Sequence, residues 1–396
     1  MNARFSRWDF ASLALLFLVS ACGGAGGSKL TPPASVGGPA AGGALATNIP
    51  KGYTLTDLGP AAGSPWLVPS AVNDHGVVVL NSSVSPLGSL PCPACTAPPQ
   101  GWVYSNGTLR QLPPLGSDLE SIADDVNNAG VISGGSAGAT GETAVLWSPN
   151  LSVENLGSGV ASPGSNAEAA AISESGKIAG FSYNATTIVP TFFDGKGGAS
   201  DPCGSSVQGY FRTGAINDAG TAAGDEFLSA GGTAAMTCPP FTTVVTPSNQ
   251  QWLDFGFGIN DSGTVVGRLS PGPSIANFHA FMSRNGATTD LGTLFPSNSD
   301  SVSAAFGINN AGLIVGFSSQ SGGTIGPPAV PPVNPRAFVY ANGKMVDLNS
   351  LLPASCANWT LITAEAISGN GYIVGVGFVG GYPSGTEHAY LLTPQS

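Results

Sequence analysis

The sequence holds only three histidines, His75, His279 and His388, as candidate acid–base groups or metal ligands. His279 and His388 begin two similar segments, HAFM and HAYLL, and Arg336 and Thr143 occupy the same place in other copies. A catalytic group would not recur as a framework position, so we expect His279 and His388 to be structural. His75 falls in a predicted hairpin turn and is expected to be solvated. No metal-binding spacing such as HExxH occurs.

The carboxylates fall into a repeated set and a non-repeated set. The repeated set lies in turns or at strand ends and comprises Asp57, Asp74, Asp218, Asp261, Asp290 and Asp347. Asp124, Asp225 and Glu226 fall outside the repeat, and we expect them to be solvated loop charges. A glycosidase would need two such carboxylates facing each other. Calcium on the turn aspartates is a further alternative, although no EF-hand-like string appears. The sequence therefore predicts no catalytic residue, no metal and no cofactor.

Five cysteines follow Cys22. Cys92-Pro-Ala-Cys95 has the spacing of a thioredoxin motif without the βαβ context, so a local disulfide between Cys92 and Cys95 is expected. Cys238 is expected in an insertion, and pairing of Cys203 with Cys238 is one alternative. The pairing of Cys356 stays open.

A nine-residue pattern occurs seven times, at a mean spacing of about 49 residues, and such repeats define a fold before any other signal does. The copies begin at Val72, Val126, Ile172, Ile216, Ile259, Ile308 and Ile367. The fifth residue is glycine in every copy: Gly76, Gly130, Gly176, Gly220, Gly263, Gly312 and Gly371. The ninth is glycine in six copies and Leu80 in the first.

Each copy has the chemistry of a β-hairpin. Asn or Ser before the turn can bond to the backbone two residues later, and the fifth-position glycine supplies the left-handed conformation that closes a bulged hairpin. The ninth-position glycine suits a close approach of neighbouring backbones.

Two further strands flank each hairpin. One resembles His-Ala-Phe plus aliphatics, as in HAFM, RAFVY and HAYLL, with GWVY, TAVLW, TFF and FTTVV as weaker versions. The other follows after a short turn and ends in Leu-Gly or a relative, as in TDLG from Thr56 and from Thr289. The sequence leaves open which of these strands begins a blade.

Four short strands in each of seven repeats predict an all-β, seven-bladed β-propeller of four-stranded antiparallel blades. The domain begins with a Leu-Gly strand, YTLTDLG, that has no His-Ala-Phe strand before it, and ends with a His-Ala-Phe strand, HAYLLTP, that has no Leu-Gly strand after it. The N- and C-terminal strands should therefore complete one blade and close the ring. The segment 190–250 departs most from the repeat, so a six-bladed or irregular ring is the alternative.

These residues resemble the HAF-repeat family of extracellular repeat proteins, over about residues 53–394. Three of the seven copies match the His-Ala-Phe motif well. The resemblance implies an exported repeat protein, and it carries over no biochemical activity.

The N-terminal sequence predicts where the protein is located in the cell. Arg4 and Arg7 precede an apolar run of about 12 residues, which is the length of a signal-peptide core and too short to span a bilayer. The run ends in Leu-Val-Ser-Ala-Cys22, which resembles a bacterial lipobox, and the resemblance implies that Cys22 is acylated. Gly23 follows, which by the same resemblance favours the outer membrane over the inner one. An ordinary secretory signal is the alternative.

Three segments follow from this: a lipoprotein signal peptide over residues 1–21, a Gly/Ala/Pro-rich tether over 22–50, and the propeller over 51–396. The location of the propeller, periplasmic or at the cell surface, stays open.

Composition limits the partners. Twelve basic residues and a formal charge of −11 argue against nucleic acid. Removing residues 1–21 leaves a charge of −12, so contact with the membrane should come only through the lipid anchor. With 57 glycines, 32 prolines and 9% charged residues, the chain suits neither a helical bundle nor a disordered protein.

The sequence favours a binding or scaffold module of the bacterial envelope, with a protein or glycan as its ligand. A polysaccharide-acting glycosidase or lyase and a purely structural envelope component are the alternatives. Long insertions follow the Gly-ending strands and precede the His-Ala-Phe strands, at about 81–100, 181–190, 225–240, 317–335 and 376–387. They should share one face, which we expect to bind because variable loops on a rigid scaffold usually do. The hairpin tips and the central channel are the other candidate surfaces.

Overall fold

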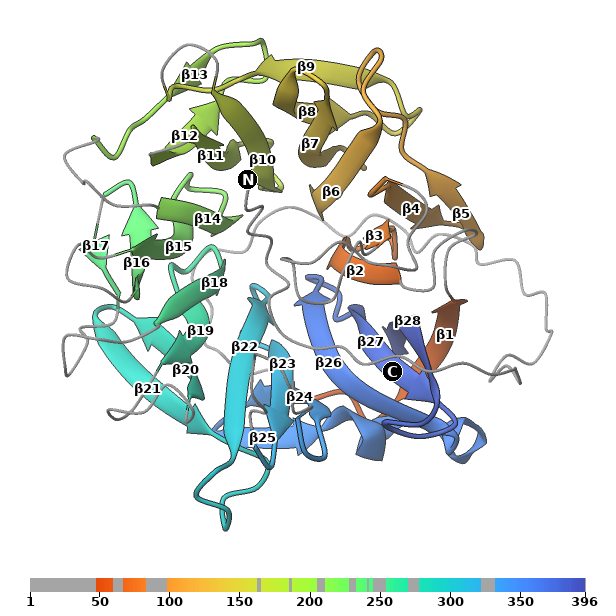
Figure 1. Ribbon diagram of the computed structural model, residues 1–396. Helices are drawn as coiled ribbons and strands as arrows, with labels where there is room; N and C mark the ends of the chain where they lie inside the picture. The colour runs from red at the N-terminus through yellow and green to blue at the C-terminus, as the bar shows by residue number, and fades with distance from the viewer. Residues whose placement is uncertain are drawn as a thin grey trace.

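The strands of the computed structural model form seven four-stranded antiparallel sheets arranged around one axis (Figure 1). The structure describes residues 48–59, 67–82, 98–161, 165–184, 187–204, 211–227, 233–240, 242–244, 254–269, 278–321 and 332–395. Within these ranges, no helix is both long enough and apolar enough to cross a membrane. The predicted all-β, seven-bladed β-propeller is confirmed.

Each blade is a meander that starts beside the axis and proceeds outward. Blade 1 comprises β2 (Leu67–Val72), β3 (Val78–Ser82), β4 (Gly101–Ser105) and β5 (Thr108–Gln111). Blade 2 comprises β6 (Glu120–Val126), β7 (Ile132–Gly138), β8 (Gly141–Trp147) and β9 (Val153–Gly157). Blade 3 comprises β10 (Asn166–Ile172), β11 (Ile178–Tyr183), β12 (Ile188–Phe193) and β13 (Ala199–Ser200). Blade 4 comprises β14 (Phe211–Ile216), β15 (Ala222–Phe227), β16 (Thr233–Cys238) and β17 (Thr242–Thr243).

The remaining blades follow the same plan. Blade 5 comprises β18 (Phe255–Ile259), β19 (Val265–Leu269), β20 (His279–Arg284) and β21 (Ala287–Gly292). Blade 6 comprises β22 (Val302–Ile308), β23 (Ile314–Ser319), β24 (Arg336–Ala341) and β25 (Lys344–Asp347), and the short 3-10 helices η1 (Leu348–Leu351) and η2 (Ala354–Cys356) follow it. Blade 7 comprises β26 (Trp359–Ile367), β27 (Ile373–Val379), β28 (Thr386–Pro394) and β1 (Tyr53–Gly59).

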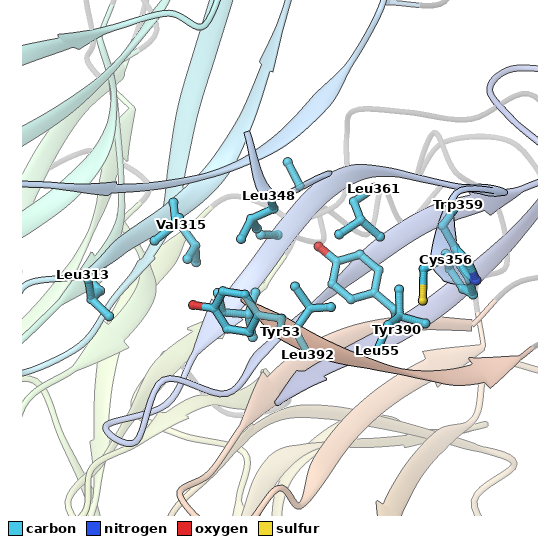
Figure 2. Close-up of a cluster of buried hydrophobic side chains, with 14 of the residues drawn as sticks. Tyr53, Leu55, Leu313, Val315, Leu348, Cys356, Trp359, Leu361, Tyr390 and Leu392 are labelled. Atoms are coloured by element: carbon cyan, nitrogen blue, oxygen red, sulfur yellow. The ribbon is translucent and has the colours of Figure 1, made fainter. Parts of the chain in front are cut away.

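The ring closes through blade 7, as the sequence predicts. Its strand order is β1-β28-β27-β26, and Tyr53 pairs with Pro394 in the ladder that joins the two ends of the domain. Tyr53 and Leu55 are buried in a cluster that blades 6 and 7 share, with Leu313 and Val315 from blade 6 and with Tyr390 close to Leu55 (Figure 2). The first strand of the domain therefore fills a core as well as completing a sheet.

One strand assignment is wrong. The sequence points to FTTVV, from Phe241, as the third strand of blade 4, whereas the third strand is Thr233–Cys238 and Thr242–Thr243 form the fourth. The third strand of this blade reads TAAMTC, which has no His-Ala-Phe signature, so the motif could not locate it. Cys238 therefore ends a strand and does not lie in an insertion.

The seven fifth-position glycines all have φ between +70° and +88°, the left-handed conformation that these turns require. The ninth-position glycines are required for a different reason, which is the lack of space for a side chain. A Cβ on Gly316 would lie 1.9 Å from the carbonyl oxygen of Ala304, and one on Gly267 would lie 1.8 Å from that of Phe255. The first strand of each of these blades thus occupies the space that a side chain would need.

The hairpin tips bond to one another around one end of the axis. The second-position asparagines accept a hydrogen bond at Oδ1 from the backbone four residues later, at 2.9 to 3.1 Å. Their Nδ2 groups donate to the backbone carbonyl of the equivalent residue in the next blade, as from Asn309 to Ser368 at 2.9 Å. Turn carboxylates add to this network, since Asp74 accepts from the backbone of Asn370 at 2.6 Å.

Replacing Asn309 with alanine should remove both of its roles, within the turn and between blades 6 and 7. Because Asn309 is 5% exposed, its partners would stay buried without hydrogen bonds, at a cost of about 2 to 3 kcal/mol in the free energy of unfolding. Asn309→Ser should cost less, because Ser173 and Ser368 already accept the same backbone bond through Oγ. Urea unfolding of both variants measures this, and equal losses would contradict the assignment.

Candidate functional site

The histidines that begin third strands are bound to the carboxylates that end fourth strands. His279 Nδ1 lies 2.8 Å from Asp290 Oδ2, and His388 Nδ1 lies 2.9 Å from Asp57 Oδ1. Arg336 holds the equivalent place and lies 3.6 Å from Asp347. These three pairs tie the third strand to the fourth in three blades, which gives both histidines a structural role. His75 is exposed at a hairpin tip.

The non-repeated carboxylates are not solvated loop charges, and that expectation is wrong. Asp225 and Glu226 lie on β15 and are 5% and 7% exposed, and burial raises the pKa of Glu226. Asp124 lies on β6, the innermost strand of blade 2, and is half-buried. Sequence reasoning missed their burial because these strands do not alternate polar and apolar residues.

Asp124 belongs to a carboxyl cluster between blades 2 and 3. Glu168 on β10 is hydrogen-bonded to both Asp124 and Glu142, and Glu142 accepts a hydrogen bond from the Tyr183 hydroxyl. Desolvation first, and then the two neighbouring carboxylates, raise the pKa of Glu168 well above its ordinary value. Groups so close share protons and do not all ionise together. Within the described ranges, no group of three such side chains has the arrangement of a metal site.

A β-bulge recurs at an equivalent position in the first strand of all seven blades and adds one residue there, and β26 has a second bulge, at Ile362. In blade 2, for example, Ala123 pairs with Gly134 and Asp125 with Ser133, which leaves Asp124 as the extra residue. The equivalent register shifts identify the other positions, and we call the set the bulge ring: Ser70, Asp124, Ala170, Gly214, Phe257, Phe306 and Glu365. Bulges re-aim side chains and are frequent beside functional sites.

Bulge positions of neighbouring blades lie close together in blades 4, 5 and 6, and Ser70 of blade 1 bonds to the residue before the bulge position of blade 2. The Phe257 and Phe306 rings meet edge to face with centroids 5.4 Å apart. Ser70 Oγ donates to the carbonyl of Ala123 at 2.6 Å, and a Cβ on Gly214 would lie 3.1 Å from the carbonyl oxygen of Phe257. The bulge ring therefore lies on the innermost strands, at points where neighbouring blades pack against each other.

Aromatic side chains gather on one arc of this ring. Phe257 stacks with Phe255 at 5.8 Å, and Phe306 stacks with Phe317 at 5.7 Å. Behind them, the buried Arg268 guanidinium lies 4.3 Å from the Phe255 ring centre and 4.8 Å from that of Phe278. Phe257 and Phe306 stay half-buried, although the rings that support them are at least nine-tenths buried.

The second strands end and the third strands begin at one end of the propeller, which we call the insertion face. Strand direction also places there the described ends of the connections between second and third strands, and the described parts of the links between successive blades. The predicted insertion 225–240 is wrong because 233–240 includes β16, and the connection 270–278 was not predicted. Among the described residues, the exposed large apolar side chains are Leu119 (67% exposed), Val160 (37%) and Val333 (48%), and all three lie in connections of this face.

A disulfide joins Cys203, after β13, to Cys238 at the end of β16, with the Cα atoms 5.8 Å apart. That separation is normal for a disulfide, and the bond links blades 3 and 4, whose fourth strands are only two residues long. Cys356 is buried beside Trp359 (Figure 2). Cys22, Cys92 and Cys95 lie outside the described residues.

Glu387 on β28 gives the closing blade a pH dependence. Burial raises its pKa from 4.5 to about 7, while His388 lowers it. Because the folded state holds this proton more tightly than the unfolded state, the contribution of Glu387 to stability is greatest below pH 4.5 and falls as the pH rises through 7. We expect the loss to reach about 3 kcal/mol by pH 8.

Glu387→Gln should abolish that loss, so the variant should be more stable than the wild type at pH 8 and equal to it near pH 4. Urea midpoints across this pH range measure the effect. Glu154→Gln, at an exposed carboxylate of β9, is the control. If the wild-type urea midpoint rose between pH 5 and 8 and Glu387→Gln removed that rise, the predicted direction of the pH dependence would be wrong.

The chain resembles solved structures at the level of fold. Virginiamycin B lyase from Staphylococcus aureus is 10% identical with a TM-score of 0.47, over 86% of this chain and 99% of that one. TolB from Acinetobacter baumannii is 11% identical with a TM-score of 0.39, over 56% of this chain and 52% of that one. A puromycin-hydrolyzing peptidase from Mycobacterium tuberculosis is 11% identical with a TM-score of 0.47, over 84% of this chain and 53% of that one.

No family model matches the chain, and no curated protein matches it significantly. The identities and TM-scores of these solved structures are too low to support any argument about function. The functional proposals below therefore rest on the residues and geometry of this chain.

Proposed function

We propose that this propeller is a lipid-anchored binding module of the bacterial envelope, of the HAF-repeat type, which presents its insertion face to a protein or glycan. The observation that carries the proposal is the position of Leu119, Val160 and Val333. In the described ranges, all three of these exposed large apolar side chains lie on that face, where a bound ligand would remove them from water.

The rigidity of the scaffold supports this role. Interblade bonds at the tips, the closing strand and the Cys203–Cys238 disulfide hold the blades together, so binding would order little of the chain. A disulfide also suits an exported protein, because the cytosol keeps thiols reduced. Acylation at Cys22 would anchor the module, with the tether over 22–50 as a spacer.

Enzymatic action on a polysaccharide is the second candidate, because the pKa of Glu168 is raised. Glycosidases keep their two carboxyl groups about 5 to 9.5 Å apart. Glu168 is instead hydrogen-bonded to both Asp124 and Glu142, which brings these groups closer than that mechanism uses. This geometry favours binding over hydrolysis.

Envelope retention of the full chain tests the proposal. Wild-type protein should sediment with the envelope. The Cys22→Ser variant should lose its acyl label and stay associated only through the insertion face. Adding Leu119→Lys, Val160→Lys and Val333→Lys should then release it.

The matched control carries the same added charge at exposed positions on the tip side: Thr108→Lys, Ala129→Lys and Ala287→Lys. Release by the control set, or retention of the insertion-face set, would overturn the proposal.

A further inference from the structure

The seven positions of the bulge ring differ in chemistry, although the turns next to them are nearly identical in sequence. Blades 5 and 6 supply Phe257 and Phe306, and blades 7 and 2 supply Glu365 and Asp124. Hairpin tips, glycines and strand pairings repeat from blade to blade because the fold requires them. A structurally equivalent position that varies from Phe to Glu to Gly is under no such shared requirement.

The aromatic arc presents partly exposed rings on the innermost strands. An innermost strand has a neighbouring blade on each face and its own second strand behind it. The exposed part of Phe257 and Phe306 must therefore face the axis or the ends of the strands. The face of a phenylalanine ring attracts a cation, and the attraction grows as the pair is removed from water.

The bulge ring also carries two carboxylates, Glu365 in blade 7 and Asp124 in blade 2. Glu365 lies in the blade next to the aromatic residues, and Asp124 lies across the axis from them. Blade 7, which carries Glu365, packs against blade 6, where a Cβ on Gly307 would lie 3.4 Å from Ala366 Cα. β6, which carries Asp124, lies across the axis from β18 and β22 (Figure 1). Glu365 and Asp124 are both half-buried. Carboxylates around low-dielectric walls concentrate cations.

We propose that the bulge ring binds an organic cation, with its ammonium group against Phe257 and Phe306 and its charge balanced by Glu365 of the adjacent blade. An amine-bearing sugar and a free polyamine share this chemistry. This site is separate from the insertion face, so the cation-binding proposal can fail while the proposed function holds, and the reverse.

Calorimetric titration of the purified full chain tests the ligand class. The probes are a glucosamine trimer, its N-acetylated counterpart and spermidine. The first and second have the same sugar rings and differ in charge. We expect binding of the glucosamine trimer at least tenfold tighter than of the N-acetylated trimer. Binding of spermidine alone would assign the site to polyamines. Equal binding of both trimers, or no binding of any probe, would overturn the proposal.

Two variants locate the site. Phe306→Leu keeps an apolar side chain against Phe317 but removes the π face, and Glu365→Gln is isosteric, so each should weaken binding of the cationic probe about tenfold. Glu154→Gln, far from the axis on β9, should leave it unchanged. Thermal unfolding reports whether Phe306→Leu folds. If this variant does not fold, the affinity of Glu365→Gln for the cationic probe tests the location of the site by itself. Unchanged affinity in folded variants would show that the cation binds elsewhere and would overturn the assignment.

Discussion

Replacing Gly316 with alanine is expected to abolish folding of the propeller, with a loss above about 4 kcal/mol in the free energy of unfolding. A Cβ at this position would lie 1.9 Å from the carbonyl oxygen of Ala304. That oxygen belongs to backbone fixed by the β22 bulge and by pairing with β23, so it cannot withdraw without breaking the sheet. Soluble yield and circular dichroism of the full chain measure the effect.

Gly307→Ala is the matched control in the same blade. Gly307 does not have a positive φ, and its nearest neighbours to an added Cβ lie at 3.4 Å, an ordinary contact. We expect this variant to fold with a change below about 1 kcal/mol. A folded Gly316→Ala protein, or equal damage from both substitutions, would show that the ninth-position glycines are not required by the bulge.

Replacing Tyr53 with alanine should cost about 3 to 5 kcal/mol and open the ring at its closure, because it removes a fully buried aromatic side chain. Tyr53 lies on β1, in the buried cluster that blades 6 and 7 share and to which blade 6 contributes Leu313 and Val315 (Figure 2). Loss of that packing should loosen β1 from β28. Hydrogen exchange in the β1 amides should therefore increase more than exchange in the outer strands of other blades.

Tyr53→Phe should have the opposite outcome. The hydroxyl is buried without a hydrogen-bond partner among the described residues, and burial raises its pKa. Removing it should leave stability unchanged or slightly higher, since a buried unpaired hydroxyl is a cost. A Phe variant as damaged as the Ala variant would mean that the hydroxyl, not the ring, secures the closure.

The repeat made the architecture predictable from sequence. Seven glycines at one turn position fix both the number of blades and the direction of the chain at the tips. The unmatched strands at the two ends predict the closure by β1 and β28. In blade 4 this reasoning failed, because its third strand has alanine and methionine where the motif has His-Ala-Phe.

The candidate sites were harder to predict, for a physical reason. A bulge shifts the register by one residue and reverses which side chains face inward beyond it, and no residue type marks that shift in the first strands. Asp124 was therefore expected to be a solvated charge, and Phe257 and Phe306 were not distinguished from core residues. The ninth-position glycine was the available signal, because a close backbone approach implies a distorted partner strand.

The most direct test of the proposed function is photo-crosslinking in intact cells from single positions on the two ends of the propeller. We place the crosslinker at 119, 160 or 333 on the insertion face and at 108, 129 or 287 on the tip side. We expect crosslinks to one envelope component from the first set and none from the second. Crosslinks from the tip side alone, or from neither set, would contradict a binding role for the insertion face.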